Sequence, residues 1–147
     1  MSMKLSSPAF TTGTEIPERY TRQGADDQPE ILIGEVPDGT AELALICHDP
    51  DAPRPAGFTH WVLYGIPPDT TRIPLNGEQA FRPGSNDFGD AGWGGPQPPE
   101  GHGRHHYFFW LYALDQPVEG APARDVFLRD YAEHVIEQSR IVGTYER

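Results

Sequence analysis

The sequence has a single cysteine, Cys47, which excludes an internal disulfide and a cluster of metal-bound thiolates. Because Cys47 lies inside an apolar run, we interpret it as a buried, inert thiol. The sequence also lacks the glycine-rich signatures of phosphate-binding and dinucleotide-binding loops, the G-x-S-x-G turn of serine hydrolases, and the H-x-H and H-E-x-x-H spacings of zinc sites. We therefore expect no cofactor, and no metal or catalytic site of these motif-defined kinds.

Cations are scarce, and Lys4 is the one lysine. The 11 lysine and arginine residues stand against 22 aspartate and glutamate residues, which gives a formal charge of −11 with neutral histidine. Nucleic acids and anionic membrane surfaces need basic patches on their partners, so we expect neither as a partner. The N-terminal stretch has no long apolar run, which argues against a signal peptide and a membrane anchor. We expect a cytoplasmic protein.

Glycine and proline are abundant, with 16 residues of each in a chain of 147. Such a composition can indicate disorder. However, aromatic residues make up 11% of the chain and the apolar runs are strong, so we predict an ordered domain that is rich in turns. The length suits one domain, spanning residues 1–147, with a substantial core.

Short apolar runs bounded by turn residues predict mostly strands. We expect strands at residues 30–36, 41–47, 59–66, 106–114 and 140–146. The run at 106–114 is apolar on both faces, which predicts a central strand that is covered on both sides. Only residues 124–138 have helical spacing, because Phe127, Tyr131 and Val135 recur at every fourth position. The pattern predicts a mainly β domain of two packed sheets with one late helix.

Residues 76–104 form a long segment without periodicity, and it contains "GDAGWGGPQPPEGHG". Long irregular loops in compact domains are usually functional or disordered. Trp93 and the pair Pro98 and Pro99 stiffen this loop, and its glycines allow backbone N–H groups to approach a ligand. We therefore expect the loop to take part in a binding site.

Polar residues gather where the expected strands begin and end, and each has a structural alternative. The "DPDAP" turn after the second run contains Asp49 and Asp51, and such turns are common without any function. His60 can equally be a hydrogen-bonded residue at a strand end. The histidines before the 106–114 run can be a solvated loop; they are His102, His105 and His106.

If these strand ends meet at one end of a sandwich, the polar residues would most simply form a binding site for an anion. Histidine N–H groups and loop amides donate hydrogen bonds to phosphate or carboxylate oxygens, and Asp49 can fix a histidine tautomer or favour its charged form. The alternative is a metal-assisted hydrolase with three ligands, Asp49, His60 and His105.

Four stretches, in order and over nearly the whole chain, resemble the phosphatidylethanolamine-binding protein family. They are "DPDAP" (49–53), "HWVLYGIP" (60–67), "GWGGPQPPEGHGRHHYFFWLYALD" (92–115) and "VGTYER" (142–147). The closer likeness is to the compact bacterial and archaeal branch, the Raf kinase inhibitor-like proteins. The resemblance implies an antiparallel β-sandwich of two sheets with a small anion pocket at one end. It assigns that pocket, and its walls and backbone contacts, to Asp49, His60, Gly95, Pro96, Pro99, His105 and Tyr107.

The same resemblance implies that Asp51 stabilises the turn. Two positions depart from the family pattern: His106 stands where arginine is usual, and Gly65 replaces an asparagine. We expect His106 to point away from His105, since neighbouring residues of a strand face opposite sides. We expect Gly65 to weaken its strand slightly.

The expected function is a non-catalytic binding and regulatory protein. It would recognise a small anionic or phosphorylated ligand and modulate a protein partner such as a kinase or a protease. Compact relatives often form homodimers, and we expect the same here.

Overall fold

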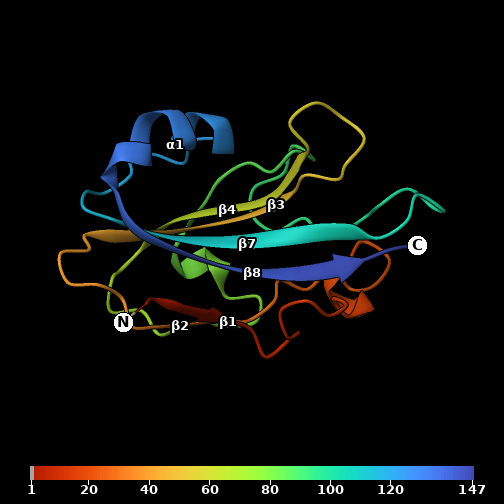
Figure 1. Ribbon diagram of the computed structural model, residues 1–147, viewed down its shortest axis with the longest axis horizontal. Coiled ribbons are helices and arrows are strands. Elements are labelled where there is room, and N and C mark those ends of the chain that lie inside the picture. Colours follow the sequence, from red (N-terminus) through yellow and green to blue (C-terminus); the bar gives the residue numbers. More distant parts are fainter. Residues whose placement is uncertain (1) are drawn as a thin grey trace.

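The computed structural model describes residues 2–147 as two antiparallel sheets packed face to face (Figure 1). The smaller sheet has the order β1-β2-β5, with the bounds Lys4–Ser6, Ile31–Gly34 and Arg72–Ile73. The larger sheet has the order β6-β4-β3-β7-β8, with the bounds Arg82–Pro83, Phe58–Ile66, Glu42–Asp49, His105–Leu114 and Val135–Tyr145.

The helix α1 (Arg124–Tyr131) lies on the outer face of the larger sheet (Figure 1). Short 3-10 turns occupy Glu18–Tyr20, Glu78–Ala80 and Ala132–His134. No helix formed by residues 2–147 is long and apolar enough to cross a membrane. The prediction of an antiparallel sandwich with one late helix is confirmed.

Strand β7 is central in its sheet, as its apolar sequence predicts, and its inner face is buried along the whole strand. Its outer face is buried only at Tyr112 and Leu114, so the prediction that it is covered on both sides holds at that end alone. Phe109 and Leu111 point into the core between the two sheets, where they join Leu45 of β3. Tyr112 points to the other face and packs with Phe127 of α1 in a second apolar cluster. Fully burying one such side chain contributes roughly 1.5–3 kcal/mol, and β7 contributes buried side chains to both apolar clusters. Cys47 is also fully buried, as predicted.

The predicted helix at 124–138 is too long. The α-helix ends at Tyr131, one 3-10 turn follows, and β8 begins at Val135. Residues 135–140 alternate between half-buried and exposed and pair with the end of β7, which is the behaviour of a strand. The four-residue spacing misled because Phe127, Tyr131 and Val135 do contact one apolar cluster, although Val135 reaches it from a strand.

The structure explains why glycine occupies position 65, which the sequence pattern did not indicate. It has a φ of +70°, and it lies where the register between β3 and β4 shifts, so that two steps on β3 oppose three on β4. Glycine adopts this conformation at little steric cost. A side chain there would also approach Arg82 Nη1, which lies 2.9 Å from the position of a Cβ atom. The residue permits a bulge, which is a more specific role than the weakened strand position that we expected.

Gly143 of β8 faces the core with no room for a side chain. It pairs with Tyr107 of β7, and a Cβ atom would lie 2.5 Å from Ile16 Cγ1 and 2.9 Å from Phe10 Cε2. Both of these neighbours are buried. This close contact holds the N-terminal segment against β8, next to the paired strand β7 that carries Tyr107.

We predict that Gly143→Ala lowers the free energy of unfolding by roughly 1–3 kcal/mol, because the extra methyl overpacks the core. Urea denaturation measures the change. Gly34→Ala in β2 is the matched control, since its new methyl would meet Lys4 Cβ at an ordinary 3.8 Å. The control should keep or slightly raise the stability, and equal losses in both variants would contradict the packing explanation.

Candidate functional site

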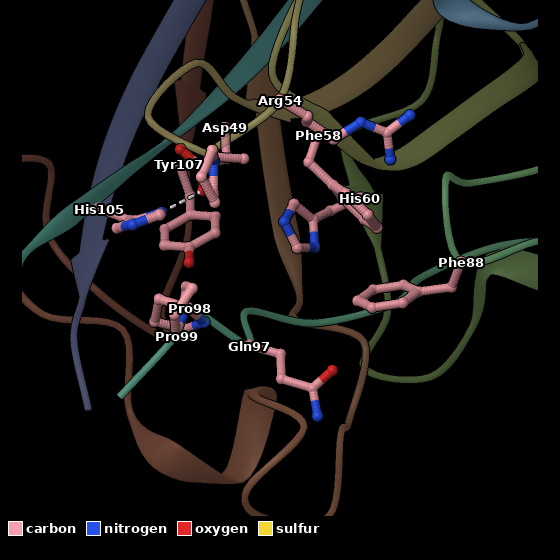
Figure 2. Close-up of a pocket in the computed structure, with 12 residues that line it drawn as sticks. Asp49, Arg54, Phe58, His60, Phe88, Gln97, Pro98, Pro99, His105 and Tyr107 are labelled. Carbon is pink, nitrogen blue, oxygen red and sulfur yellow. Dashed lines mark hydrogen bonds and ion pairs between the residues drawn. The ribbon is translucent and has the colours of Figure 1, made fainter. Parts of the chain in front are cut away.

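The polar strand ends converge at one end of the larger sheet. β3 ends at Asp49, β4 begins at Phe58 and β7 begins at His105, and the antiparallel pairing brings these three ends together. Residues 84–104 extend alongside them. A cavity of about 240 Å³ lies at this end. Figure 2 shows the rings of His60, His105 and Tyr107 grouped around it.

Five of the seven site residues that the sequence suggested line this cavity. They are Asp49, His60, Pro99, His105 and Tyr107. The other two, Gly95 and Pro96, do not line it. Instead, the Gly95 amide donates to Asp26 Oδ1 at 2.8 Å, and the Pro96 carbonyl accepts from the Arg22 amide at 3.0 Å. These two residues anchor the loop to residues 20–26, and the expectation that they supply the cavity wall is corrected.

Sequence reasoning missed the cation of the site and much of its apolar wall. Arg54 lies in the turn between β3 and β4, and its Cζ atom is 5.3 Å from the centroid of the Phe58 ring. Phe88 packs against Phe58, with 4.6 Å between ring centroids. The signal for Arg54 was its place directly after "DPDAP". The signal for Phe88 was that it is one of two aromatic residues, with Trp93, in the irregular segment 84–104. Further lining residues are Ala52, Pro53, Gln97 and Pro98.

The Asp49 carboxylate is buried and fully hydrogen-bonded. Its Oδ2 accepts from His105 Nδ1 at 2.6 Å, and its Oδ1 accepts from the Asp51 amide at 2.7 Å. Its side chain and that of His105 are only 3% and 2% exposed. Burial raises the pKa of Asp49, and the hydrogen bond from His105 opposes that rise. The carboxylate therefore fixes the orientation of His105, with Nδ1 as the donor.

Asp51 serves the turn, as the resemblance implied. Its Oδ2 accepts from both the amide and Nδ1 of His106, each at 2.8 Å. His106 is exposed and lies outside the cavity lining, on the opposite side of β7 from His105. Position 106, where the family usually has arginine, therefore makes a surface contact between the "DPDAP" turn and β7. In this chain His106 makes that contact through its hydrogen bonds to Asp51.

His60 presents a hydrogen-bond acceptor to the cavity. Its Nδ1 lies 2.7 Å from the carbonyl oxygen of Gly94, which can only accept, so Nδ1 carries the proton. Burial lowers the pKa of His60 to about 4, which keeps the ring neutral near pH 7. Its Nε2 therefore bears a lone pair. The ring packs edge-on against Tyr107, with 5.2 Å between centroids.

Tyr107 presents a donor without a partner. The residue is fully buried, and within residues 2–147 its hydroxyl makes no hydrogen bond. Burial, followed by the charge of Asp49, raises the pKa of Tyr107 well above its usual value, so the hydroxyl keeps its proton. Leaving a buried hydroxyl unpaired costs roughly 1–3 kcal/mol, which a suitable ligand would recover.

The metal alternative finds no support in the arrangement of the side chains. Among residues 2–147, no group of three or more histidine, cysteine, aspartate or glutamate side chains is placed to hold a metal ion. Asp49 Oδ2 and His105 Nδ1 are hydrogen-bonded to each other, and His60 Nδ1 is hydrogen-bonded to the backbone of the loop, so these atoms are not free to bind a metal.

The fold and the cavity together define a β-sandwich with a cavity at one end. Comparison with known proteins gives its family: residues 6–146 match the family model described as "Phosphatidylethanolamine-binding protein". A UPF0098 protein of Aquifex aeolicus is 42% identical over 154 aligned positions, covering 99% of this chain and 89% of its own. A UPF0098 protein of Methanothermobacter thermautotrophicus is also 42% identical, covering 99% of both chains. The chain belongs to the phosphatidylethanolamine-binding protein family.

Solved structures agree with this assignment. A protein of Chlamydia trachomatis described as a homolog of phosphatidylethanolamine-binding protein superimposes with a TM-score of 0.91 at 32% identity, covering 99% of this chain and 98% of its own. YbcL of E. coli, described as a member of the mammalian family, has the same TM-score at 29% identity and covers 100% and 99%.

We predict that His60 gives the stability a specific pH dependence. The pKa of histidine is 6.5 without burial and about 4 for His60 in the fold. Between these values the unfolded chain takes up a proton that the folded chain does not, so acid destabilises the fold through this residue. Relative to His60→Asn, the wild-type free energy of unfolding should fall by roughly 1.2 kcal/mol as the pH is lowered from about 6 to about 5.

Chemical denaturation at each pH measures this difference. Phe58→Leu changes the same cavity wall without removing a titratable group, so its stability curve should stay parallel to that of the wild type. A His60→Asn curve that is also parallel to the wild type would show that His60 is protonated equally in both states.

Proposed function

We propose that this protein binds a small phosphate-type oxyanion, either free phosphate or the phosphate of a monoester, in the cavity at the ends of β3, β4 and β7. The observation that carries the proposal is the Tyr107 hydroxyl, a buried and unpaired donor in the wall of a cavity that the exposed residue Arg54 also lines. Figure 2 shows this hydroxyl pointing away from Asp49 and toward Pro98 and Pro99. Membership of the family supports a binding role for the protein as a whole.

The polarity of the cavity favours phosphate over other anions. Tyr107 donates and Arg54 contributes positive charge, whereas Nε2 of neutral His60 can only accept. A ligand that satisfies all three must offer both a charged oxygen and a protonated one. A phosphate or phosphate monoester that retains one proton does so, and a carboxylate or a sulfate does not at neutral pH. The His60 N–H and the Gly95 amide, which the sequence suggested as donors, are already used within the protein.

The cavity limits the ligand to a small head group and the affinity to a modest value. Its volume of about 240 Å³ is below the roughly 300 Å³ at which pockets for drug-sized molecules begin. The net charge of −11 opposes anions at long range, although salt screens charges beyond about 8 Å at physiological ionic strength. Asp49 opposes them at short range, but both of its oxygens already accept hydrogen bonds.

The apolar wall of the cavity suits an apolar group attached to the phosphate. Phe58, Phe88 and Pro98 line the cavity, so a phosphate attached to an alkyl or aromatic group would place that group against them. We propose that this lets the protein recognise a phosphorylated partner, such as a kinase or a protease, and act without catalytic turnover. The family resemblance supports this step. The homodimer and the cytoplasmic location remain predictions.

We predict that Tyr107→Phe weakens phosphate binding roughly tenfold to a hundredfold, the usual effect of losing a hydrogen bond to a charged group. Because the hydroxyl has no partner in the protein, the same change should preserve or raise the free energy of unfolding. Titration with phosphate, followed by amide chemical shifts, measures the affinity.

Tyr64→Phe is the matched control. The Tyr64 hydroxyl donates to the Pro122 carbonyl oxygen at 2.8 Å, on the face of the sheet that α1 covers. This control should lose roughly 1 kcal/mol of stability and keep its phosphate affinity. Wild-type shifts near Tyr107 that do not respond to phosphate would contradict the proposal.

We predict that Arg54→Gln weakens phosphate binding roughly twofold to fivefold and makes it less dependent on salt, because a partly solvated charge is lost. Arg140→Gln is the control. Arg140 stacks on Phe108 at 5.3 Å, the distance between Arg54 and Phe58, but it does so on the outer face of the sheet. Equal effects of the two substitutions would indicate a general charge effect, with no local contact.

A further inference from the structure

The buried pair of Asp49 and His105 extends outward to a third residue. Nδ1 of His102 lies 2.6 Å from Nε2 of His105, and Nδ1 of His105 lies 2.6 Å from Asp49 Oδ2. Asp49 and His105 are almost fully buried, and His102 is exposed. The three side chains therefore form an unbroken chain of hydrogen bonds from the surface to the wall of the cavity. His102 itself does not line the cavity.

The shared bond restricts the protons that the chain can hold. Nδ1 of His105 must be protonated, because the Asp49 carboxylate accepts from it. The bond between the two rings then needs one proton, either on His102 Nδ1 or on His105 Nε2. In the first case both rings are neutral. In the second case His105 is an imidazolium and donates to His102. If both rings were charged, two N–H groups would face each other and the bond would break.

We propose that His102 is a positioning residue of the site, and that it shares with His105 a single titrating proton. The proton enters from solvent at Nε2 of His102, and the proton on His102 Nδ1 passes to Nε2 of His105. The wall of the cavity thereby gains one positive charge without movement of a buried side chain. The chain of three residues changes from a net charge of −1 to zero.

This inference rests on the proposed function where it concerns the ligand. An anion in the cavity interacts better with the neutral chain of residues than with the negative one, so binding and proton uptake favour each other. Thermodynamic linkage requires the effect to be reciprocal. Phosphate should therefore draw one proton into the histidine pair, and loss of His102 should weaken that response.

Other charged and titratable groups surround the pair. Asp49 faces it from β3, and Asp51 from the following turn, where it is already bonded to His106. The Tyr107 ring stacks on that of His105 at 6.5 Å, and His60 and Arg54 line the same cavity. Tyr145 of β8 pairs with His105, and the Arg147 carbonyl accepts from the amide of Gly101, beside His102. Glu100 and Arg104 flank His102 in the sequence.

Two glycines flank His102, so the backbone on either side constrains its position little and the bond to His105 matters more. Gly101 and Gly103 have φ values of +73° and +92°, and no atom lies within 4 Å of where their side chains would begin. The described contacts of the His102 side chain are those with His105, the hydrogen bond and a ring contact with centroids 4.9 Å apart. The His102 ring is thus held mainly by the bond that it makes to the site.

The test follows the ring nitrogens of the 15N-labelled protein by NMR between about pH 8 and pH 5. Without any ligand, the ring nitrogens of His102 and His105 should shift together over one pH range, with one proton taken up between them. If His102 shifts by itself while His105 keeps a neutral ring, the shared proton is refuted. This readout does not depend on phosphate, so it can fail or succeed independently of the proposed function.

A second arm adds phosphate at pH 7. In the wild type, Nε2 of His105 should move toward the shift of a protonated ring nitrogen, while His102 changes from the Nδ1–H to the Nε2–H tautomer. His102→Asn keeps a polar group near the former Nδ1 position but cannot take up a proton, and it should lower phosphate affinity roughly twofold to tenfold and flatten its rise toward low pH. His134→Asn is the control, because His134 lies beyond the far end of β7. It should change neither the phosphate affinity nor its dependence on pH. A wild-type pH profile in His102→Asn would leave only a structural role and would overturn the inference.

Discussion

The buried carboxylate of Asp49 is the constraint around which this end of the molecule is arranged. One oxygen holds the turn that follows β3 through the Asp51 amide, and the other holds the first residue of β7 through its imidazole. A carboxylate this deeply buried is costly unless its lone pairs are used. The same two bonds that satisfy it therefore fix the turn, the start of β7 and the tautomer of His105 at once.

His60 and Tyr107 follow a different rule, since burial keeps both of them uncharged. His60 has a pKa of about 4 and remains a neutral acceptor, and Tyr107 keeps its proton as a donor. The cavity thus combines one compensated negative charge, one cation at Arg54 and two neutral groups of opposite hydrogen-bonding sense. That combination is the basis of our proposal that the ligand is a partly protonated oxyanion.

The longer strands and their antiparallel packing could be predicted from apolar runs bounded by turns, and the convergence of Asp49, His60, His105 and Tyr107 from the resemblance to the family. The short strands β1, β5 and β6 could not be predicted, because two or three residues show no periodicity. The end of the helix could not, since Val135 continues the four-residue spacing while belonging to β8. Arg54 could not be assigned either, because loop sequences do not encode which side chains turn inward. The roles of Gly95 and Pro96 depended on contacts with residues distant in the sequence, which no local pattern records.

The loop that closes the cavity is fastened to the N-terminal part of the chain. Residues 22 and 26 hold Pro96 and Gly95, and the carbonyl of Tyr20 accepts from the indole of Trp93 at 3.2 Å. None of these three N-terminal residues lines the cavity. A substitution in this short segment can therefore move the loop, and with it part of the cavity wall, while every residue that lines the cavity stays the same.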